Sequence, residues 1–506
     1  MGAARARSVA LAGTDGRVVE ITAEVSKGPP GLTLASMTEP GMWETRDRIR
    51  AAVVNSGESW PDQRLTITVP ATPGGGPHHD LAIAVAVLAA SGTVPSPPQK
   101  AVLLGELGLD GQLHPVRGVL PAVRVAAAAG CGEVIVPQDN AAEAALVAGI
   151  QVTGADSLAA VLAYLCGNTS AVGSPPAGPA ARPAAGEYLP PPDLADVIGQ
   201  QTAKHAAEVC AAGGHHLLLT GPRGSGAALV AERVAGLLPP LEPEAALEVT
   251  ALHSLAGLLE SGDPLISRPP FISPHHTTAT AAVVGGRGSP IRPGVASLAH
   301  RGVLFLNEAP EFDSRVLDAL RQPLECGEVA IARVGQVARF PAAFTLVMTA
   351  WPCPCGDPGQ GCGCTPLARR RYLGRLAGPL ASRTDLTIAM TPPARLHRAG
   401  GPGAGELSSA VAQRVAAARA RAAARLAGTP WHLNAQVPGP ELRHRFALAP
   451  GTLAPLERAV ELGEVSAFGA GRALAVAWTL ADLADLDRPG PDEAAAALTL
   501  RRGTGA

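Results

Sequence analysis

Residues 221–228 have the glycine spacing of a loop that binds the phosphates of a nucleotide. The octet is Gly-Pro-Arg-Gly-Ser-Gly-Ala-Ala, and Gly221 and Gly226 match the glycines of the motif G-x-x-x-x-G-K-[ST]. Ala227 replaces the lysine that reaches the phosphates, and Ala228 replaces the hydroxyl residue that binds Mg²⁺. The octet therefore predicts a phosphate-binding loop without its main cation and its first magnesium ligand. An ordinary Gly/Pro turn is the alternative interpretation.

The segments on either side predict the elements that such a loop requires. Residues 215–220 are a short apolar run, typical of a buried strand. Residues 227–238 are rich in Ala, Leu and Val and precede a Pro-Pro pair, which predicts a helix that ends at proline. Backbone N–H groups at the start of that helix favour a bound anion. Arg223 is a candidate substitute cation, although this loop position usually points away from the phosphates.

A second motif lies about eighty residues further on. Residues 302–308 form an apolar run that ends in Asn307 and Glu308. In nucleotide hydrolases an Asp at the first position orients Mg²⁺, and a following Glu can activate water. Asn307 keeps the shape of that Asp but lacks the charge that a hard cation prefers. The candidate nucleotide-binding residues are Gly221, Pro222, Arg223, Gly224, Ser225, Gly226, Ala227, Ala228 and Asn307, with Glu308 as a candidate catalytic group.

With these motifs, the chain resembles the magnesium-chelatase-like AAA+ proteins of the YifB/ComM type along nearly its whole length. The resemblance is carried by Gly199-Gln200, residues 212–219, Pro274-His275-His276, residues 297–300, 321–325 and 352–356, Asn434-Ala435-Gln436 and Ala481-Asp482-Leu483. It implies an α/β multidomain fold, with a Lon-protease-like α/β domain, a central AAA+ parallel sheet with helices and a C-terminal helical lid. Active members of this family are hexameric ATPases, and some are DNA branch-migration helicases in natural transformation.

The resemblance also implies roles for residues outside the loop. Trp351 stands where the family has a sensor Asn, after the strand at residues 344–349. Arg383 aligns with the arginine finger, which would act on the nucleotide of a neighbouring subunit. Arg472 is the candidate sensor-2 residue of the lid. A surface ion pair is the alternative interpretation of each arginine.

Composition shifts divide the chain into candidate domains. Residues 168–192 are rich in Pro, Ala, Gly and Ser, which predicts a semi-flexible linker. We expect the Lon-like domain at residues 1–167, the AAA+ module at 193–392 and the helical lid at 393–506. The turn at residues 75–80 holds no serine and Leu120 stands near the lysine position, so we expect no Ser-Lys peptidase.

Four of the eight cysteines lie in a glycine-rich loop at residues 353–364. Cys353, Cys355, Cys362 and Cys364 have the pattern C-x-C-x₆-C-x-C. Clustered thiols outside an oxidising compartment favour a metal over disulfides, and four thiolates suit structural zinc. Free or redox-active thiols are the alternative.

Composition limits the choice of partners and location. The 506 residues carry a formal net charge of −2, which argues against a generally basic nucleic-acid surface. DNA contact would have to be local, at Arg369-Arg370-Arg371 or on the arginine-rich helix at residues 408–426, where a solvated charged face is the alternative. We find no segment of membrane-spanning length and no signal peptide, so we expect a cytoplasmic protein without a membrane contact.

Three functions remain open from the sequence. The favoured one is an AAA+ subunit of a homo- or hetero-hexamer that binds ATP weakly, with little need for Mg²⁺, and hydrolyses it poorly or not at all. The second is an active ATP-driven DNA remodelling motor. The third is a non-catalytic binding scaffold.

Overall fold

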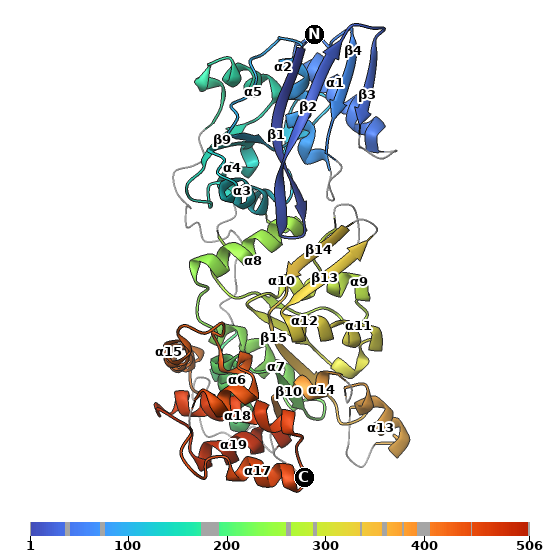
Figure 1. The fold of residues 1–506 in the computed structure, drawn as a ribbon. Helices are drawn as coiled ribbons and strands as arrows, with labels where there is room; N and C mark the ends of the chain where they lie inside the picture. The colour runs from blue at the N-terminus through green and yellow to red at the C-terminus, as the bar shows by residue number, and fades with distance from the viewer. Residues whose placement is uncertain are drawn as a thin grey trace.

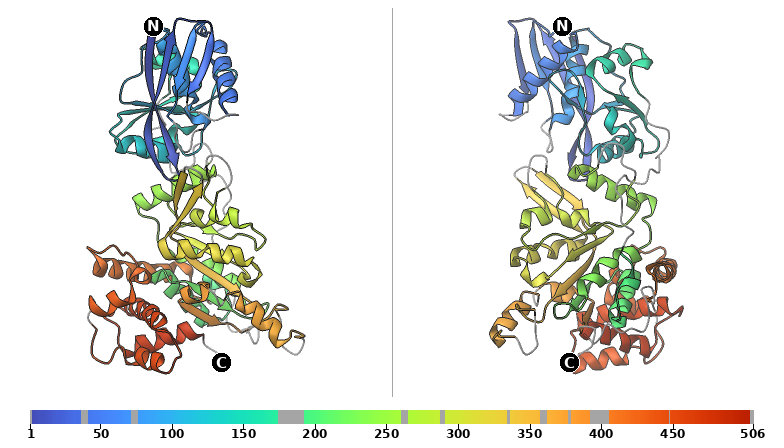
Figure 2. Two further views of the ribbon diagram at one scale, coloured as in Figure 1. Left: turned by 45° about the vertical axis from the view of Figure 1, so that its right-hand side comes forward. Right: turned by 180° about the vertical axis from the view of Figure 1, so that it is seen from behind.

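The computed structural model is an elongated molecule with two large sheets and a group of C-terminal helices (Figure 1). It describes residues 2–35, 41–70, 76–173, 192–259, 265–286, 291–333, 336–356, 362–376, 379–391, 405–446 and 448–503. The two further views in Figure 2 show the N-terminal part and the C-terminal helices at opposite ends of the central sheet.

The N-terminal part is built on a seven-stranded sheet of order β3-β4-β2-β1-β5-β8-β9. Its strands are β1 (Gly2–Ala12), β2 (Asp15–Ser26), β3 (Gly31–Ala35), β4 (Arg64–Thr68), β5 (Ala101–Leu103), β8 (Glu133–Pro137) and β9 (Gln151–Ala155), and a short pair is formed by β6 (Glu106–Leu107) and β7 (Leu113–His114). Its helices are α1 (Gly41–Asn55), α2 (Asp80–Ala90), α3 (Val119–Ala128), α4 (Gln138–Ala144) and α5 (Leu158–Leu165). Helix α2 is apolar on all sides, and ten of its eleven residues are buried, so it is the central core helix of this part.

The central sheet is parallel throughout, in the order β11-β12-β15-β10-β16. Its strands are β10 (Leu217–Thr220), β11 (Phe271–Ile272), β12 (Val303–Leu306), β15 (Thr345–Ala350) and β16 (Leu386–Ala389), and a separate hairpin joins β13 (Glu328–Arg333) to β14 (Gln336–Pro341). All six residues of β15 are buried, as expected for a strand covered on both faces. The carboxyl ends of β10, β12 and β15 meet at one edge, which is where open parallel sheets bind ligands.

Helices cover this sheet and form the C-terminal group. The helices of the central part are α6 (Gln201–Gly213), α7 (Ala227–Arg233), α8 (Pro243–Ala256), α9 (Thr280–Val284), α10 (Val295–Leu298), α11 (Ser314–Ala319), α12 (Arg321–Cys326), α13 (Pro366–Gly374) and α14 (Pro379–Arg383). The C-terminal helices are α15 (Ser408–Leu426), α16 (Gly439–His444), α17 (Ala454–Glu461), α18 (Ala467–Leu483) and α19 (Pro491–Arg502). Helix α18 lies at the centre of this group, and its Trp478 is 2% exposed.

The N-terminal part contacts the central part through α3 and α8. The N–H of Gly118 donates to Ser254 Oγ at 3.0 Å, and the Ser254 hydroxyl donates to the Glu143 carboxylate. Arg124 of α3 pairs with Glu244, which lies on α8 like Ser254. The β1–β2 turn adds a backbone hydrogen bond, from Thr14 N–H to the Arg339 carbonyl at 3.2 Å. These contacts join segments far apart in the sequence without using the predicted linker.

The mixed α/β multidomain fold class is confirmed. The helix predicted at residues 227–238 ends earlier, at Arg233, because residues 235–237 form a 3₁₀ turn. The exact domain borders stay predictions, since residues 174–191 and 392–404 lie outside the described part, as does Gly75 of the predicted serine-free turn. Within the described residues, no helix combines the length and the apolar content needed to cross a membrane.

Candidate nucleotide site and cysteine cluster

The loop at residues 221–226 connects β10 to α7 at the carboxyl edge of the central sheet. Gly224 and Gly226 have φ values of 78° and 84°, a left-handed conformation that favours glycine. The N–H of Gly221 donates to the Ala350 carbonyl at 3.1 Å, which holds the loop against the end of β15. A Cβ at Gly221 would lie 2.8 Å from the Met390 carbonyl oxygen, so only glycine fits there. The predicted order of strand, glycine loop and helix is present.

The two alanines at the start of α7 are packing residues. Ala227 and Ala228 are partly buried and contact the main hydrophobic core of the central part. Their methyl groups offer neither a charge for a phosphate nor an oxygen for Mg²⁺. The loop therefore presents backbone N–H groups without the side chains that normally reinforce them.

The Arg223 side chain lies against Trp351, the residue that follows β15. Its guanidinium carbon lies 4.2 Å from the centre of the Trp351 ring, in a cation–π contact. Its backbone N–H donates to the Gly356 carbonyl at 3.0 Å. In this structure, Arg223 is thus not placed as a substitute cation.

The end of β12 forms a closed hydrogen-bonded unit with β15. The Thr349 hydroxyl donates to Asn307 Oδ1 at 2.8 Å and accepts from the Glu308 N–H at 2.9 Å. Glu308 has a φ of 55° and its side chain is partly exposed at the carboxyl edge of the sheet. Thr349 is not among the predicted site residues, although a threonine at the end of an apolar strand is a usable signal.

Arg383 lies at the end of α14 and contacts two other segments. Its guanidinium is 2.9 Å from the Glu325 carboxylate of α12 and 5.5 Å from the centre of the Phe468 ring. The Arg383 and Glu325 side chains are 31% and 43% exposed, so water screens their attraction. Arg383 is therefore held weakly within its own chain.

Arg472 is held strongly, in a buried network. Its guanidinium donates two hydrogen bonds of 2.5 Å to Asp385, which is fully buried, and a third of 2.6 Å to the Ala435 carbonyl. Asp385 also accepts from the His216 N–H at 2.9 Å. Burial alone would raise the pKa of Asp385, but the Arg472 charge and the hydrogen bonds outweigh it and hold the pKa far below its usual range. The network ties α18 to the edge of the central sheet, and the sensor-2 role of Arg472 stays a prediction.

A second buried polar network lies behind the first. Asn434 donates to Asp482 at 2.8 Å and to Thr479 at 3.0 Å, and Arg425 donates two hydrogen bonds to Asp482. Asn434 and Asp482 belong to the segments that carried the family resemblance. Asn434 and Asp482 are buried, and their hydrogen bonds join α15 to α18 within the C-terminal group.

The four cysteines of the predicted cluster come together. Their sulfur atoms all lie within 4.8 Å of one another, with Cys353 and Cys355 at 3.1 Å and Cys355 and Cys362 at 3.4 Å. A tetrahedral zinc with Zn–S bonds of about 2.3 Å needs S–S separations of roughly 3.8 Å. Hydrogen bonds from the Cys364 backbone and the Cys355 thiol lower the pKa of Cys362 to about 6, which favours a thiolate at neutral pH. The cluster can hold a metal ion; residues 357–361 of this loop lie outside the described part.

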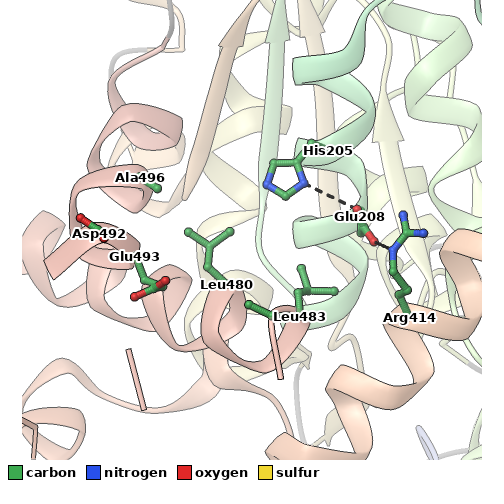
Figure 3. A pocket seen from close by; sticks show the side chains of 9 residues that line it. His205, Glu208, Arg414, Leu480, Leu483, Asp492, Glu493 and Ala496 are labelled. Atoms are coloured by element: carbon green, nitrogen blue, oxygen red, sulfur yellow. Dashed lines mark hydrogen bonds and ion pairs between the residues drawn. The ribbon is translucent and has the colours of Figure 1, made fainter. Parts of the chain in front are cut away.

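The arginines of α15 are engaged within the chain. Arg414 pairs with Glu208 at 2.6 Å, beside a hollow of about 420 Å³ between α6, α15, α18 and α19 (Figure 3). Arg419 donates to the Ala211 carbonyl, and Arg421 pairs with Asp485 at 2.6 Å. These arginines have ion-pair or hydrogen-bond partners within the chain, as a charged helix face does, and a local DNA contact on this helix stays a prediction. On α13, Arg369 donates to Cys362, whereas Arg370 and Arg371 are exposed.

Comparison with known proteins agrees with this architecture. Three family profiles match: magnesium chelatase subunit ChlI over residues 193–397, subunit ChlI of Mg-chelatase over 21–140, and the ChlI C-terminal region over 405–501. The chain is therefore a magnesium-chelatase-like protein, with the profiles covering all three parts of the fold.

Relatives along the full length define the family more closely. An uncharacterized protein of Mycobacterium tuberculosis is 49% identical over 100% of both chains. Protein YifB of Escherichia coli is 40% identical, and the competence protein ComM of Haemophilus influenzae is 37% identical, each over 94% of this chain and 93% of the relative. The chain belongs to the YifB/ComM family of magnesium-chelatase-like proteins.

Removing the Asp385 carboxylate should destabilise the attachment of the lid. We expect Asp385→Ala to lower the free energy of unfolding by about 3–5 kcal/mol, because it leaves a buried guanidinium without its partner. Urea unfolding measures the change. The matched control is Glu464→Ala, which breaks the exposed pair of Glu464 with Arg502 in the same lid and should cost less than about 1 kcal/mol. Equal losses in the two variants would contradict a special role for Asp385.

Proposed function

We propose that this chain is an AAA+ subunit that binds ATP weakly and hydrolyses it poorly or not at all, and that it acts within an oligomer. The observation that carries this proposal is the state of three positions at the carboxyl edge of the sheet. Ala227 and Ala228 are packed into the core, and Asn307 accepts a hydrogen bond from Thr349. All three lack the group that would grip Mg²⁺ or a phosphate.

The amount of affinity lost with these groups decides whether ATP binding is weak or absent. A hydrogen bond to a charged group is worth about 1.5–3 kcal/mol, so a missing lysine costs roughly ten- to a hundred-and-fifty-fold in affinity. The left-handed glycines and the N–H groups of the loop remain, and they can still bind an anion. Hydrolysis loses more, because Mg²⁺ normally neutralises the charge that develops on the phosphate oxygens.

Titration with a labelled ATP analogue tests the nucleotide site. We expect weak binding with little dependence on Mg²⁺ and no turnover. Ala227→Lys combined with Ala228→Thr should tighten Mg²⁺-dependent binding by about ten- to a hundredfold, because the two substitutions return the cation and the metal ligand. Leu229→Lys is the control, since it adds the same charge on the same helix at a position 47% exposed. Rapid Mg²⁺-dependent hydrolysis by the unaltered protein would refute the proposal.

Within an oligomer, a subunit that does not hydrolyse ATP in its own pocket can still act on the nucleotide of a neighbouring subunit. The Mg-chelatase family usually forms oligomeric AAA+ assemblies, in which an arginine can act on a neighbour's nucleotide. Arg383 suits this role because its half-exposed pair with Glu325 is worth at most about 1 kcal/mol. The guanidinium can therefore exchange Glu325 for a phosphate of the next subunit at small cost. We infer that Arg383 acts in trans.

A mixing experiment tests the action of Arg383 in trans. The acceptor subunit carries Ala227→Lys, Ala228→Thr and Asn307→Asp to restore its pocket, and Arg383→Ala to remove its arginine. Adding the unaltered chain should raise ATP turnover by roughly a hundredfold or more, as arginine fingers do. Adding a chain with Arg383→Ala should leave turnover unchanged, whereas Arg421→Ala, on the distant α15, should act like the unaltered chain. An equal rise with the Arg383→Ala chain would exclude this role.

We also infer that the cysteine cluster holds a structural zinc ion. Four converging sulfur atoms and a thiol with a pKa of about 6 support this cofactor. Zinc would fix the glycine-rich loop that follows β15 and would take no part in chemistry at the phosphates.

Metal analysis of the purified protein tests the cofactor. We expect about one zinc per chain, as in closed four-cysteine sites. Cys355→Ser should lose most of the zinc, because it removes one of four ligands. Cys166→Ser alters an exposed cysteine far from the cluster in sequence and should retain the full amount. Full zinc retention by Cys355→Ser would contradict the assignment. So would a purified protein that holds no metal and takes up none when zinc is added.

A further inference from the structure

The cysteine cluster and the nucleotide loop are joined by consecutive backbone hydrogen bonds. The N–H of Arg223, inside the loop, donates to the Gly356 carbonyl at 3.0 Å. The N–H of Gly356 in turn donates to the Cys353 carbonyl at 3.0 Å. Cys353 is 1% exposed, and its sulfur lies 3.1 Å from that of Cys355. A single tight turn therefore separates two of the candidate metal ligands from the phosphate-binding loop.

A side-chain contact runs beside the backbone connection. The Arg223 guanidinium stacks on Trp351 at 4.2 Å, and Trp351 lies two residues before Cys353. Cation–π contacts of this kind change an equilibrium by about two- to fivefold at exposed sites. Arg223 is thus bound on two sides by residues 351–356, once through its backbone and once through its side chain.

The packing at this junction leaves little freedom. Gly356 has a φ of 72°, in the left-handed region, and a Cβ there would lie 2.7 Å from Arg223 Nε. Because the two segments are in close contact, a movement of the cysteine turn must move Arg223 as well. Arg223 is flanked in the loop by Pro222 and Gly224, and its displacement would re-aim the N–H groups that face a phosphate.

We propose that Arg223 and Trp351 are positioning residues that transmit the metal state of the cysteine cluster to the nucleotide loop. Metal bound by the four thiolates fixes the Cys353–Gly356 turn, and the turn holds Arg223 and the loop in the arrangement that accepts phosphates. Loss of the metal frees the turn and weakens nucleotide binding. This inference rests on the proposed weak binding of ATP and names what regulates it.

The coupling must act in both directions. If metal binding tightens ATP binding by some factor, ATP tightens metal binding by the same factor. One hydrogen bond and one cation–π contact make about a tenfold effect reasonable, which lies within the usual range for coupled sites.

The experiment compares zinc-loaded protein with reduced protein stripped of metal by a chelator. The first readout is tryptophan emission without nucleotide, which should change on zinc loading and lose that change in Trp351→Phe. The second readout is the affinity for a labelled ATP analogue, which should fall about tenfold when zinc is removed. Trp351→Phe keeps an aromatic face and should preserve this ratio, whereas Trp351→Ala and Arg223→Ala should reduce it by about two- to fivefold, because they remove the cation–π contact and leave the backbone hydrogen bond. Trp431→Phe is the control for the emission change.

The outcomes separate this inference from the proposed function. A protein that binds no ATP in either metal state refutes the proposed function, while the Trp351 emission change still decides whether the metal controls the junction. Unchanged Trp351 emission and unchanged ATP affinity on zinc removal would overturn the inference, as would a cluster that takes up no zinc. Arg223 is exposed, so Arg223→Ala tests the contact even if Trp351→Ala does not fold.

Discussion

A fully buried carboxylate, Asp385, joins the central parallel sheet to the C-terminal helices. It lies directly before β16 and accepts hydrogen bonds from Arg472 of α18 and from the backbone just before β10. His215, next to His216, adds a hydrogen bond to Thr479 of α18 at 2.7 Å. Asn434 also bonds Thr479 and Asp482, so buried polar contacts continue from the start of β10 into the C-terminal helices.

The residues of the candidate nucleotide site make contacts within the chain. Asn307 is satisfied by Thr349, Arg223 by Trp351 and Gly356, and the two alanines by the apolar core. A normal site keeps its polar groups available and therefore depends on nucleotide and Mg²⁺ to neutralise them. Here Asn307 Oδ1 and the backbone N–H groups of Glu308 and Arg223 have partners within the chain, and the Glu308 side chain is partly exposed.

Local patterns were sufficient to predict the strand–loop–helix unit and the convergence of the cysteines, whereas the fold class came from the resemblance to a known family. The glycines at residues 224 and 226 and the short C-x-C spacings constrain the backbone locally, so their geometry follows from neighbouring residues. The partners of Arg223, Arg383 and Arg472 could not be predicted, because each lies at least fifty residues away in sequence or depends on how the lid packs. The arginines of α15 show the same limit: helical periodicity indicated a shared face, but it could not predict their partners within the chain, such as Glu208 for Arg414 and Asp482 for Arg425.

The contact between α3 and α8 means that the predicted linker at residues 168–192 is not needed to orient the two parts that it connects. Gly118, Ser254 and Glu143 form a hydrogen-bonded unit, and the β1–β2 turn adds a second point of attachment to β14. Two separate attachments fix the orientation of one part relative to the other. The contacts then set the orientation of the two parts, and the covalent connection between them only raises their local concentration. The N-terminal part therefore packs on the central part as a partner domain would, through α3, α4 and the β1–β2 turn.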